Sequence, residues 1–368
     1  MSGATSDPSV AGHLVDVDAA ALERAVAACF TGFGVPAADA ALVAEVLVYA
    51  DLRGLTGHGV YRAPAYLERV RRGLAGGTRD MAEIGGVGAA RRIDAGHALG
   101  PAAATRAVDR ATELARTHGV GLVALRRTTH LGAAGFYVQR AARAGMVAIV
   151  TSNGPRAVAP HGAAEAFLGT NPLAVGMPLG RHGELVLDMS TAAMPREQIR
   201  IAAAAGREIP PGMAVDPTGR PTTDAAAAMA GSVLPVGGVK GSGLSLVVAL
   251  LAGLVCDAEF DDEIGSMYSD FDRPQNLGQV FVVIDPGLLG PREHALARVE
   301  AFVDRLHALR VAEGADGVWF SGERGSERAA RRRAEGIPLR PAVLEDLAQA
   351  CETQGLAAEA AAVRALTG

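Results

Sequence analysis

The chain has few cysteines, few aromatic residues and no segment typical of a targeting signal. Its three cysteines, Cys29, Cys256 and Cys351, lie far apart without CxxC spacing, which argues against a disulfide framework or a structural zinc site and favours a reducing compartment. The first twenty residues contain Asp7 and no apolar stretch, and the longest apolar run, Leu244 to Cys256, is well short of a membrane span. We therefore expect a cytoplasmic protein that does not enter the membrane.

Several functional signatures are also missing. The 40 acidic and 35 basic side chains give a formal net charge of −5, and no long basic tract is present, so nucleic acid is not an expected partner. The densest basic run, Arg328 to Arg333, is interpreted as a solvated helix face. The nine histidines show no HExxH spacing and no serine lies in a GxSxG elbow, so we expect no metal site and hydrolase chemistry is disfavoured.

A dinucleotide fingerprint is absent as well. The one nominal GxGxxA, Gly119 to Ala124, follows a helix and opens a strand, the reverse of the order that a phosphate site requires. The segment Gly237 to Gly243 instead offers backbone amides and Lys240 just before a predicted helix, 244–255. Such a helix start suits a phosphate or pyrophosphate, although a glycine-rich loop with a solvent-facing lysine explains the same residues.

The 368 residues are enough for two domains. Apolar periodicity predicts helices and strands in two groups. The helices are expected at 19–33, 37–52, 60–73, 100–118, 293–309 and 342–354, and the strands at 120–125, 146–152, 173–177, 184–189 and 279–285. The fold class is therefore α/β (α+β), with residues 1–119 and 286–368 packed together as a mainly helical domain and residues 120–285 inserted as a sheet domain.

The most informative stretch is DLRGLTGHGVYR, residues 51–62. Glycines on both sides leave the imidazole of His58 unshielded, and Arg62 supplies a forked cation that can hold a carboxylate in two hydrogen bonds. The stretch is compatible with proton transfer beside an anchored acid, and also with a surface pair near a helix start.

Other candidate residues lie where strands end. His130 follows a predicted strand and precedes a helix rich in small residues, a position where α/β proteins place reactive side chains. Asn153 and the segment Leu168 to Pro172 offer polar groups on tight turns, which is also ordinary turn chemistry. Asp188 ends a strand, and Ser190 is a predicted N-cap of the following helix.

Eight segments taken in order resemble the type 2 malate/L-lactate dehydrogenase family, which includes ureidoglycolate and sulfolactate dehydrogenases, 2,3-diketogulonate reductase and delta-1-piperideine-2-carboxylate reductase. The resemblance runs from about residue 20 to about residue 350. The segments are DLRGLTGHGVYR, THLGAAGFY, TSNGPRAVAPHG, LGTNPLAVGMP, LVLDMSTAA, LPVGGVKGSGLSL, QVFVVIDP and SGER.

The resemblance implies hydride transfer between NAD or NADP and a small 2-hydroxy acid, 2-oxo acid or cyclic imino acid, on a cofactor domain unrelated to the Rossmann fold. It also implies a homodimer whose partner subunit contributes to the cleft. It assigns His130 and His58 as acid/base candidates, and Arg62, Thr170 and Asn171 to the substrate. The residues that it assigns to the cofactor are Ser152, Asn153, Asp188, Met189, Ser190, Lys240, Gly241, Gly322 and Glu323.

Two positions depart from the family pattern. Gly57 stands where the family usually has serine, and Thr129 where it usually has asparagine. A hydrogen-bonding group lost from a substrate pocket changes discrimination strongly, so the identity of the substrate does not transfer, whereas the nicotinamide carries the hydride in any case. A catalytically idle nucleotide-binding homologue is the alternative, and a metal-assisted hydrolase using His58, His130 and Asp188 is a third.

Overall fold

The computed structural model describes residues 13–288 and 290–367. Residues 1–12, which make up most of the segment read for a leader, lie outside the described residues. The centre is a seven-stranded sheet of order β2-β3-β4-β11-β5-β6-β7, in which only the β3–β4 pairing is parallel. The strands are β2 (Ala82–Val87), β3 (Ala90–Asp94), β4 (Val120–Thr128), β5 (Val147–Ser152), β6 (Leu173–Pro178), β7 (Glu184–Met189) and β11 (Leu277–Ile284).

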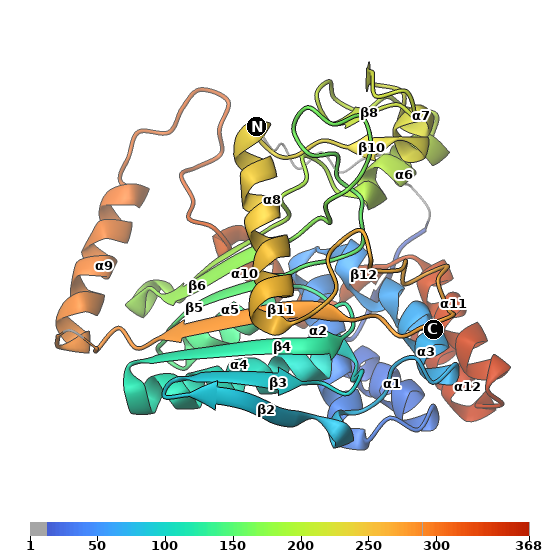
Figure 1. Ribbon diagram of the computed structural model, residues 1–368, viewed down its shortest axis with the longest axis horizontal. Helices are drawn as coiled ribbons and strands as arrows, with labels where there is room; N and C mark the ends of the chain where they lie inside the picture. The colour runs from blue at the N-terminus through green and yellow to red at the C-terminus, as the bar shows by residue number, and fades with distance from the viewer. Residues whose placement is uncertain (1–12, 289, 368) are drawn as a thin grey trace.

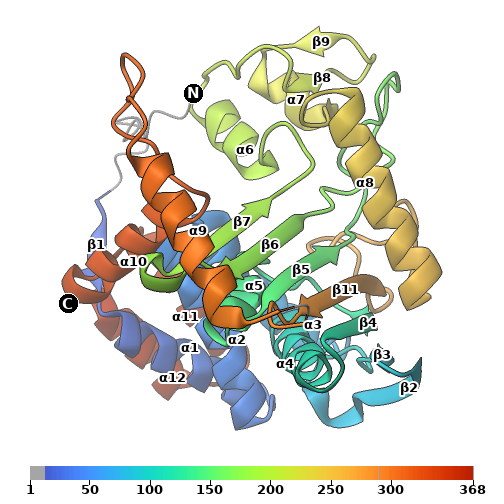
Figure 2. The same ribbon diagram turned by 90° about the vertical axis from the view of Figure 1, so that its left-hand side faces the viewer.

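Helices cover both faces of this sheet (Figure 2). On one face α2 (Ala37–Arg53), α4 (Gly100–His118) and α5 (Gly135–Arg143) share a buried core with the strands. On the other face lie α8 (Val239–Leu251) and the π-helical turn Ala252–Cys256 that continues it. Close packing depends on Gly121, where an added Cβ would lie 2.0 Å from the carbonyl oxygen of Ala111 in α4.

Helices from the two ends of the chain pack together (Figure 1). Helices α1 (Ala19–Gly32), α2, α3 (Ala63–Arg71), α11 (Pro341–Thr353) and α12 (Ala357–Arg364) bury a common apolar core. Strand β1 (Val15–Val17) pairs with β12 (Ile337–Leu339), which joins the first described strand to the last.

A smaller lobe follows β7. It contains α6 (Arg196–Ala204), α7 (Ala225–Ala230), β8 (Ala214–Val215), β9 (Pro221–Thr222) and β10 (Ser232–Val233) around a core of its own. After β11, α9 (Arg292–His307) extends away from the sheet and α10 (Glu323–Glu335) returns to it (Figure 1). Short 3₁₀ turns lie at Thr56–His58, Val60–Arg62, Thr78–Asp80, Gly180–His182 and Ala365–Thr367.

The main differences from the sequence-based elements concern four segments. Residues 82–94 fall in the predicted helical domain yet form β2 and β3 of the sheet. The helix expected over 60–73 is a 3₁₀ turn followed by α3. The helix expected from Ser190 begins instead at Arg196, because Ala192 forms an antiparallel bridge with Pro235 and the amide of Ala193 donates to the carbonyl of Leu234. The basic run is only partly a solvated face, since Arg328 and Arg332 donate to backbone carbonyls of α2.

The helix that contains the longest apolar run begins earlier than predicted. Val239–Cys256 has a mean hydropathy of 2.0 over 18 residues and is, by length and composition alone, one helix that could cross a membrane. Counting from Leu244 missed its first turn, which contains Lys240 and three small residues. Only 33% of the segment is buried, so much of an apolar helix faces outward.

Candidate active site

The loop 54–62 is folded back onto the end of α2. Gly54 ends the helix with a left-handed φ of 82°, which glycine adopts without steric cost. The buried carboxylate of Asp51 accepts the amide of Val60 at 2.8 Å, and an added Cβ on Gly59 would lie 2.0 Å from Asp51 Oδ1. Gly54 and Gly59 are thus required by the backbone conformation and packing of this loop. They fix the position of His58, just before Gly59, and of Arg62, three residues after it.

Gly57 has no such steric role. A Cβ added there would meet its nearest atom, Cγ of Glu197 in α6, at 3.8 Å, which is ordinary van der Waals distance. The glycine that departs from the family pattern therefore leaves room in the site without being required by the fold.

The structure brings the two predicted histidines together. The rings of His58 and His130 stack with centroids 5.7 Å apart and an interplanar angle of 21°. Nδ1 of His130 lies 2.7 Å from the hydroxyl of Tyr66 and accepts the amide of Gly132 at 3.1 Å. Because an amide can only donate, we assign Nδ1 as unprotonated, so the neutral ring carries its proton on Nε2.

The surroundings of both rings disfavour the imidazolium form. Burial, and then the charge of Arg62, lower the pKa of His58 to about 4. The same two causes, followed by the neighbouring His58, lower the pKa of His130 well below its usual value. Both rings are therefore neutral at pH 7 in the ligand-free protein.

Arg62 contributes a cation that has no acidic partner among the described residues. Its Nε donates to the carbonyl of Gly57 at 2.6 Å, and its Nη1 lies 3.6 Å from the sulfur of Met267 and donates to the hydroxyl of Tyr268. Within residues 13–288 and 290–367 no carboxylate oxygen comes within 4.0 Å of it. The remaining N–H groups of the guanidinium can therefore bind an anion.

Thr129, the second departure from the family pattern, supports the backbone. Its hydroxyl accepts the amide of Gly100 at the start of α4 at 2.8 Å, and its carbonyl accepts Nε2 of Gln279 at 3.0 Å. An added Cβ on Gly100 would lie 2.3 Å from the carbonyl oxygen of His130. The start of α4 therefore packs directly on the turn that carries His130.

Strand register places most of the other candidates at one end of the sheet. Leu277 pairs with Thr128, Gln279 with Ser152, Thr151 with Leu173, and Leu173 with Met189. The residues at these strand ends, and those next to them in the chain, therefore lie in a row. The candidates in this row are His130, Ser152, Asn153, Thr170, Asn171, Asp188, Met189 and Ser190.

Within the row, the buried amide side chains bind protein groups. Asn153 donates to the carbonyl of Glu259 at 2.7 Å and accepts the amide of Gly278 at 2.9 Å. Asn171, fully buried, donates to Asp261 Oδ2 at 2.6 Å and to the carbonyl of Ser245 at 3.0 Å. These groups hold three loops together, although Oδ1 of Asn171 is buried without a hydrogen-bond partner among the described residues.

Other members of the row remain accessible. Asp188 is exposed and accepts the amide of Gly135 at the start of α5 at 2.7 Å. Thr170, Met189 and Ser190 are half-buried, and the Ser190 hydroxyl donates to the carbonyl of Thr170 at 3.0 Å. Ser152, in contrast, is buried, and its hydroxyl donates to the carbonyl of Asn153.

The segment of Lys240 lies beside this row. The amide of Val236 donates to the carbonyl of Thr191 at 2.9 Å, which brings the glycine-rich turn and the start of α8 next to Ser190. Lys240 is exposed, and an added Cβ on Gly241 would lie 2.0 Å from the carbonyl oxygen of Val236. The lysine therefore projects from a tightly packed turn.

Gly322 and Glu323 lie at the edge of the sheet, against β7. The amide of Val186 donates to the carbonyl of Ser321 at 2.9 Å, and the carbonyl of Gly322 accepts Nη2 of Arg53 at 2.8 Å. The Glu323 carboxylate accepts the amide of Phe320 at 3.1 Å. Both residues thus help to begin α10.

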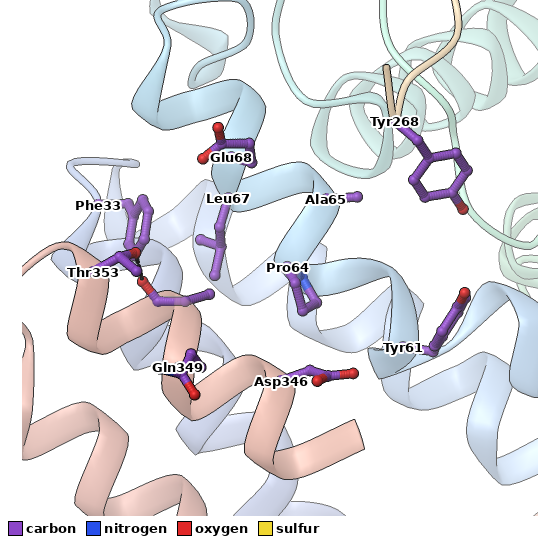
Figure 3. A pocket seen from close by; sticks show the side chains of 11 residues that line it. Phe33, Tyr61, Pro64, Ala65, Leu67, Glu68, Tyr268, Asp346, Gln349 and Thr353 are labelled. Atoms are coloured by element: carbon purple, nitrogen blue, oxygen red, sulfur yellow. Dashed lines mark hydrogen bonds between the residues drawn. The ribbon is translucent and has the colours of Figure 1, made fainter. Parts of the chain in front are cut away.

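Three residues at the site escaped sequence reasoning: Tyr66, Met267 and Tyr268. Tyr66 lies four residues after Arg62, so helical spacing could have indicated it. Met267 and Tyr268 come from a loop more than 200 residues away and carried no signal. Tyr268 also lines a cavity of about 470 Å³ between α3 and α11, shown in Figure 3, where its hydroxyl and that of Tyr61 point toward one another.

The fold and the site define a class of protein. Residues 17–348 match the model of the malate/L-lactate dehydrogenase family, and the chain belongs to this family of oxidoreductases. It is 35% identical to a (2R)-3-sulfolactate dehydrogenase (NADP(+)) from Chromohalobacter salexigens over 88% of this chain and 95% of the relative. It is also 35% identical to the ureidoglycolate dehydrogenase (NAD(+)) of Escherichia coli O157:H7, over 83% and 87% of the two chains.

The solved structure of sulfolactate dehydrogenase from Methanocaldococcus jannaschii superposes with a TM-score of 0.87. It is 32% identical and covers 93% of this chain and 98% of its own. The predicted α/β class and the family resemblance are therefore confirmed.

Proposed function

We propose that the protein transfers hydride between NAD or NADP and C2 of a small 2-hydroxy acid, 2-oxo acid or cyclic imino acid. The observation that carries this proposal is Arg62, a cation without an acidic partner among the described residues, next to two stacked neutral imidazoles. The two relatives named for NADP(+) and NAD(+) act on small acids by their names, which supports the same chemistry here.

The residues that would hold the dinucleotide fit it chemically. Lys240 has no acidic partner in the described part of the chain and projects from a turn whose amides suit a phosphate. The other candidates lie at or beside the ends of β5 and β7, in a sheet that is largely antiparallel, and at the starts of α8 and α10. They are Ser152, Asn153, Asp188, Met189, Ser190, Gly241, Gly322 and Glu323. When bound, the nicotinamide supplies or accepts the hydride.

The protein groups bind the acid and move a proton. Arg62 holds the substrate carboxylate, with Thr170 and Asn171 as further candidates. Nε2–H of His130 hydrogen-bonds the oxygen or nitrogen at C2, because its Nδ1 is already an acceptor. Carboxylate binding cancels the charge of Arg62, which removes one cause of the low histidine pKa values and lets His130 or His58 carry the transferred proton.

A screen of NADH and NADPH oxidation over 2-oxo and cyclic imino acids tests the reaction. Arg62→Ala should raise KM for every carboxylate substrate by about 10- to 100-fold, and an unchanged KM would count against the role of Arg62. His58→Ala and His130→Ala identify the proton carrier, whose loss should cost roughly two to four decades in rate. Saturable NAD(P)H binding without turnover of any acid would favour the idle homologue.

We further propose that the protein is a homodimer that buries the outer face of α8. That face carries Leu244, Leu246, Val247, Leu250 and Leu254, which are 42 to 80% exposed. A monomer in water rarely leaves so many large apolar side chains on one helix face. An identical helix from a second copy would cover them.

Sedimentation of a Leu250→Asp/Leu254→Asp variant tests this assembly. The variant should sediment as a monomer at concentrations where the parent is a dimer, whereas Val87→Asp, at an 82% exposed valine of β2, should leave the dimer intact. A monomeric parent that co-sediments with phosphatidylcholine vesicles would refute the dimer and assign the face to a membrane.

A further inference from the structure

Two side chains of the loop 257–276 contact the guanidinium of Arg62. Met267 Sδ lies 3.6 Å from Nη1, and the Tyr268 hydroxyl accepts a hydrogen bond from the same nitrogen. The Tyr268 ring centroid is 5.5 Å from Cζ of Arg62. The loop thus covers the Nη1 side of the fork, whereas Nη2 has no hydrogen-bond partner among the described residues.

The position of this loop is fixed by α3. Arg69, only 1% exposed, donates to the carbonyls of Asp270 at 2.8 Å and Arg273 at 3.1 Å. It lies seven residues, or about two helical turns, after Arg62. The cation of Arg72 lies 4.1 Å from the ring centroid of Phe271 in the same loop. These contacts hold the loop, and Tyr268 with it, against α3 and Arg62.

We infer that Tyr268 is a second carboxylate-binding residue of the site, an inference that rests on the proposed function. A neutral phenol oxygen is a weaker acceptor for a guanidinium than a carboxylate is, so the incoming carboxylate replaces it at Nη1. The freed phenol then donates its O–H to a carboxylate oxygen, because a phenol is both acceptor and donor. Arg62 and Tyr268 together present only donors to the substrate.

A site that presents only hydrogen-bond donors favours a ligand group that carries only acceptors. A carboxylate offers acceptors on both oxygens, whereas the amide of the same acid turns an NH₂ group toward a donor and loses one contact. The site therefore favours a free 2-oxo or imino acid over its neutral amide, and Tyr268 contributes part of that preference.

The structure leaves Tyr268 room to make this exchange. Its side chain is 50% exposed and lines the cavity of about 470 Å³ shown in Figure 3. Tyr61 lines the same cavity, with its hydroxyl pointing toward that of Tyr268 from the facing side, but this hydroxyl makes no hydrogen bond to a described residue. Tyr61 is therefore a matched control in the same cavity.

The test compares Tyr268→Phe with Tyr61→Phe, using the acid that the wild type reduces best and its amide analogue. Tyr268→Phe should raise KM for the acid about tenfold, the effect of one hydrogen bond to a charged group, with kcat within about twofold. KM for the dinucleotide should not change, and the discrimination between acid and amide should fall. Tyr61→Phe should behave as the wild type.

Calorimetric titration of the acids of the screen, pyruvate and oxaloacetate among them, into the proteins loaded with oxidised NAD or NADP measures binding without turnover, because the oxidised cofactor has no hydride to give. Acid binding by a wild type that oxidises neither NADH nor NADPH with any acid of the screen would count against the proposed reaction alone. Equal or tighter acid binding by Tyr268→Phe would overturn the inference, since a hydroxyl that only competes with the substrate improves binding when it is removed. Failure of the wild type to bind any acid of the screen would overturn both.

Discussion

Replacing Gly59 with alanine should both destabilise the protein and impair the site. The backbone of Gly59, with φ −86° and ψ −155°, is one that alanine can adopt, so the effect isolates a single contact. The new Cβ would lie 2.0 Å from Asp51 Oδ1, 2.2 Å from Cγ and 2.3 Å from Oδ2. Since Asp51 is 2% exposed, its carboxylate has no free space into which to move.

The expected cost has two parts. Overpacking a buried site costs about 1 to 3 kcal/mol, and losing the hydrogen bond from the Val60 amide to Asp51 costs about 1 to 3 kcal/mol more. The sum, about 2 to 6 kcal/mol, is a large share of a typical folding free energy of about 5 to 15 kcal/mol. Moving the loop by about 1 Å would also misplace His58 and Arg62 and lower kcat/KM by roughly 100-fold.

Urea unfolding and steady-state kinetics measure the two effects. Gly57→Ala is the matched control, because its Cβ would meet nothing closer than 3.8 Å and its unfolding free energy should stay within about 0.5 kcal/mol of the parent. In the double variant Asp51→Ala/Gly59→Ala the clash is gone, so its loss should be smaller than the sum of the two single losses. If Gly59→Ala unfolds like Gly57→Ala, the steric argument is wrong.

Three further results are expected. Tyr66→Phe removes the hydroxyl from His130 Nδ1 and should lower kcat by about 10- to 100-fold with little change in KM for the acid; a normal kcat would exclude an orienting role. Because the pKa of His58 is lowered to about 4, its neutral form persists above that pH. If His58 is the base, kcat/KM for oxidation should therefore fall only as the pH drops through about 4, and a midpoint near 6.5 would contradict the assigned burial. Lys240→Met should raise KM for the dinucleotide and leave KM for the acid unchanged, which separate titrations of the two substrates can check.

The sequence was most informative where its local pattern was strong. Helices 100–118 and 341–353 and strand 184–189 have clear periodicity and clear glycine or proline boundaries, and they were predicted almost to the residue. Strands β2 and β3 were missed because β2 is exposed along its whole length and contains Gly85 and Gly86, so no alternation of apolar residues marks it.

Within the candidate site, the sequence alone indicated which residues could act chemically, but it did not show what those residues contact. His58 and Arg62 could be found because unusual glycines surround them, and the structure brings both next to His130. Nothing local distinguishes an asparagine that faces a ligand from Asn171, whose amide is buried against Asp261. The partners of Arg62 in the loop 257–276 depend on chain folding over 200 residues, which no short motif records.

The arginines of α10 have a consequence for the order in which the protein becomes functional. Arg328 and Arg332 donate to the carbonyls of Arg53 and Asp51, which lie 275 and 281 residues earlier in the chain, at the point where the loop of His58 begins. During synthesis on the ribosome these carbonyls stay without those partners until most of the polypeptide has emerged. We therefore expect the loop of His58 and Arg62 to become rigid only after α10 has been made, although its residues are synthesised long before that helix.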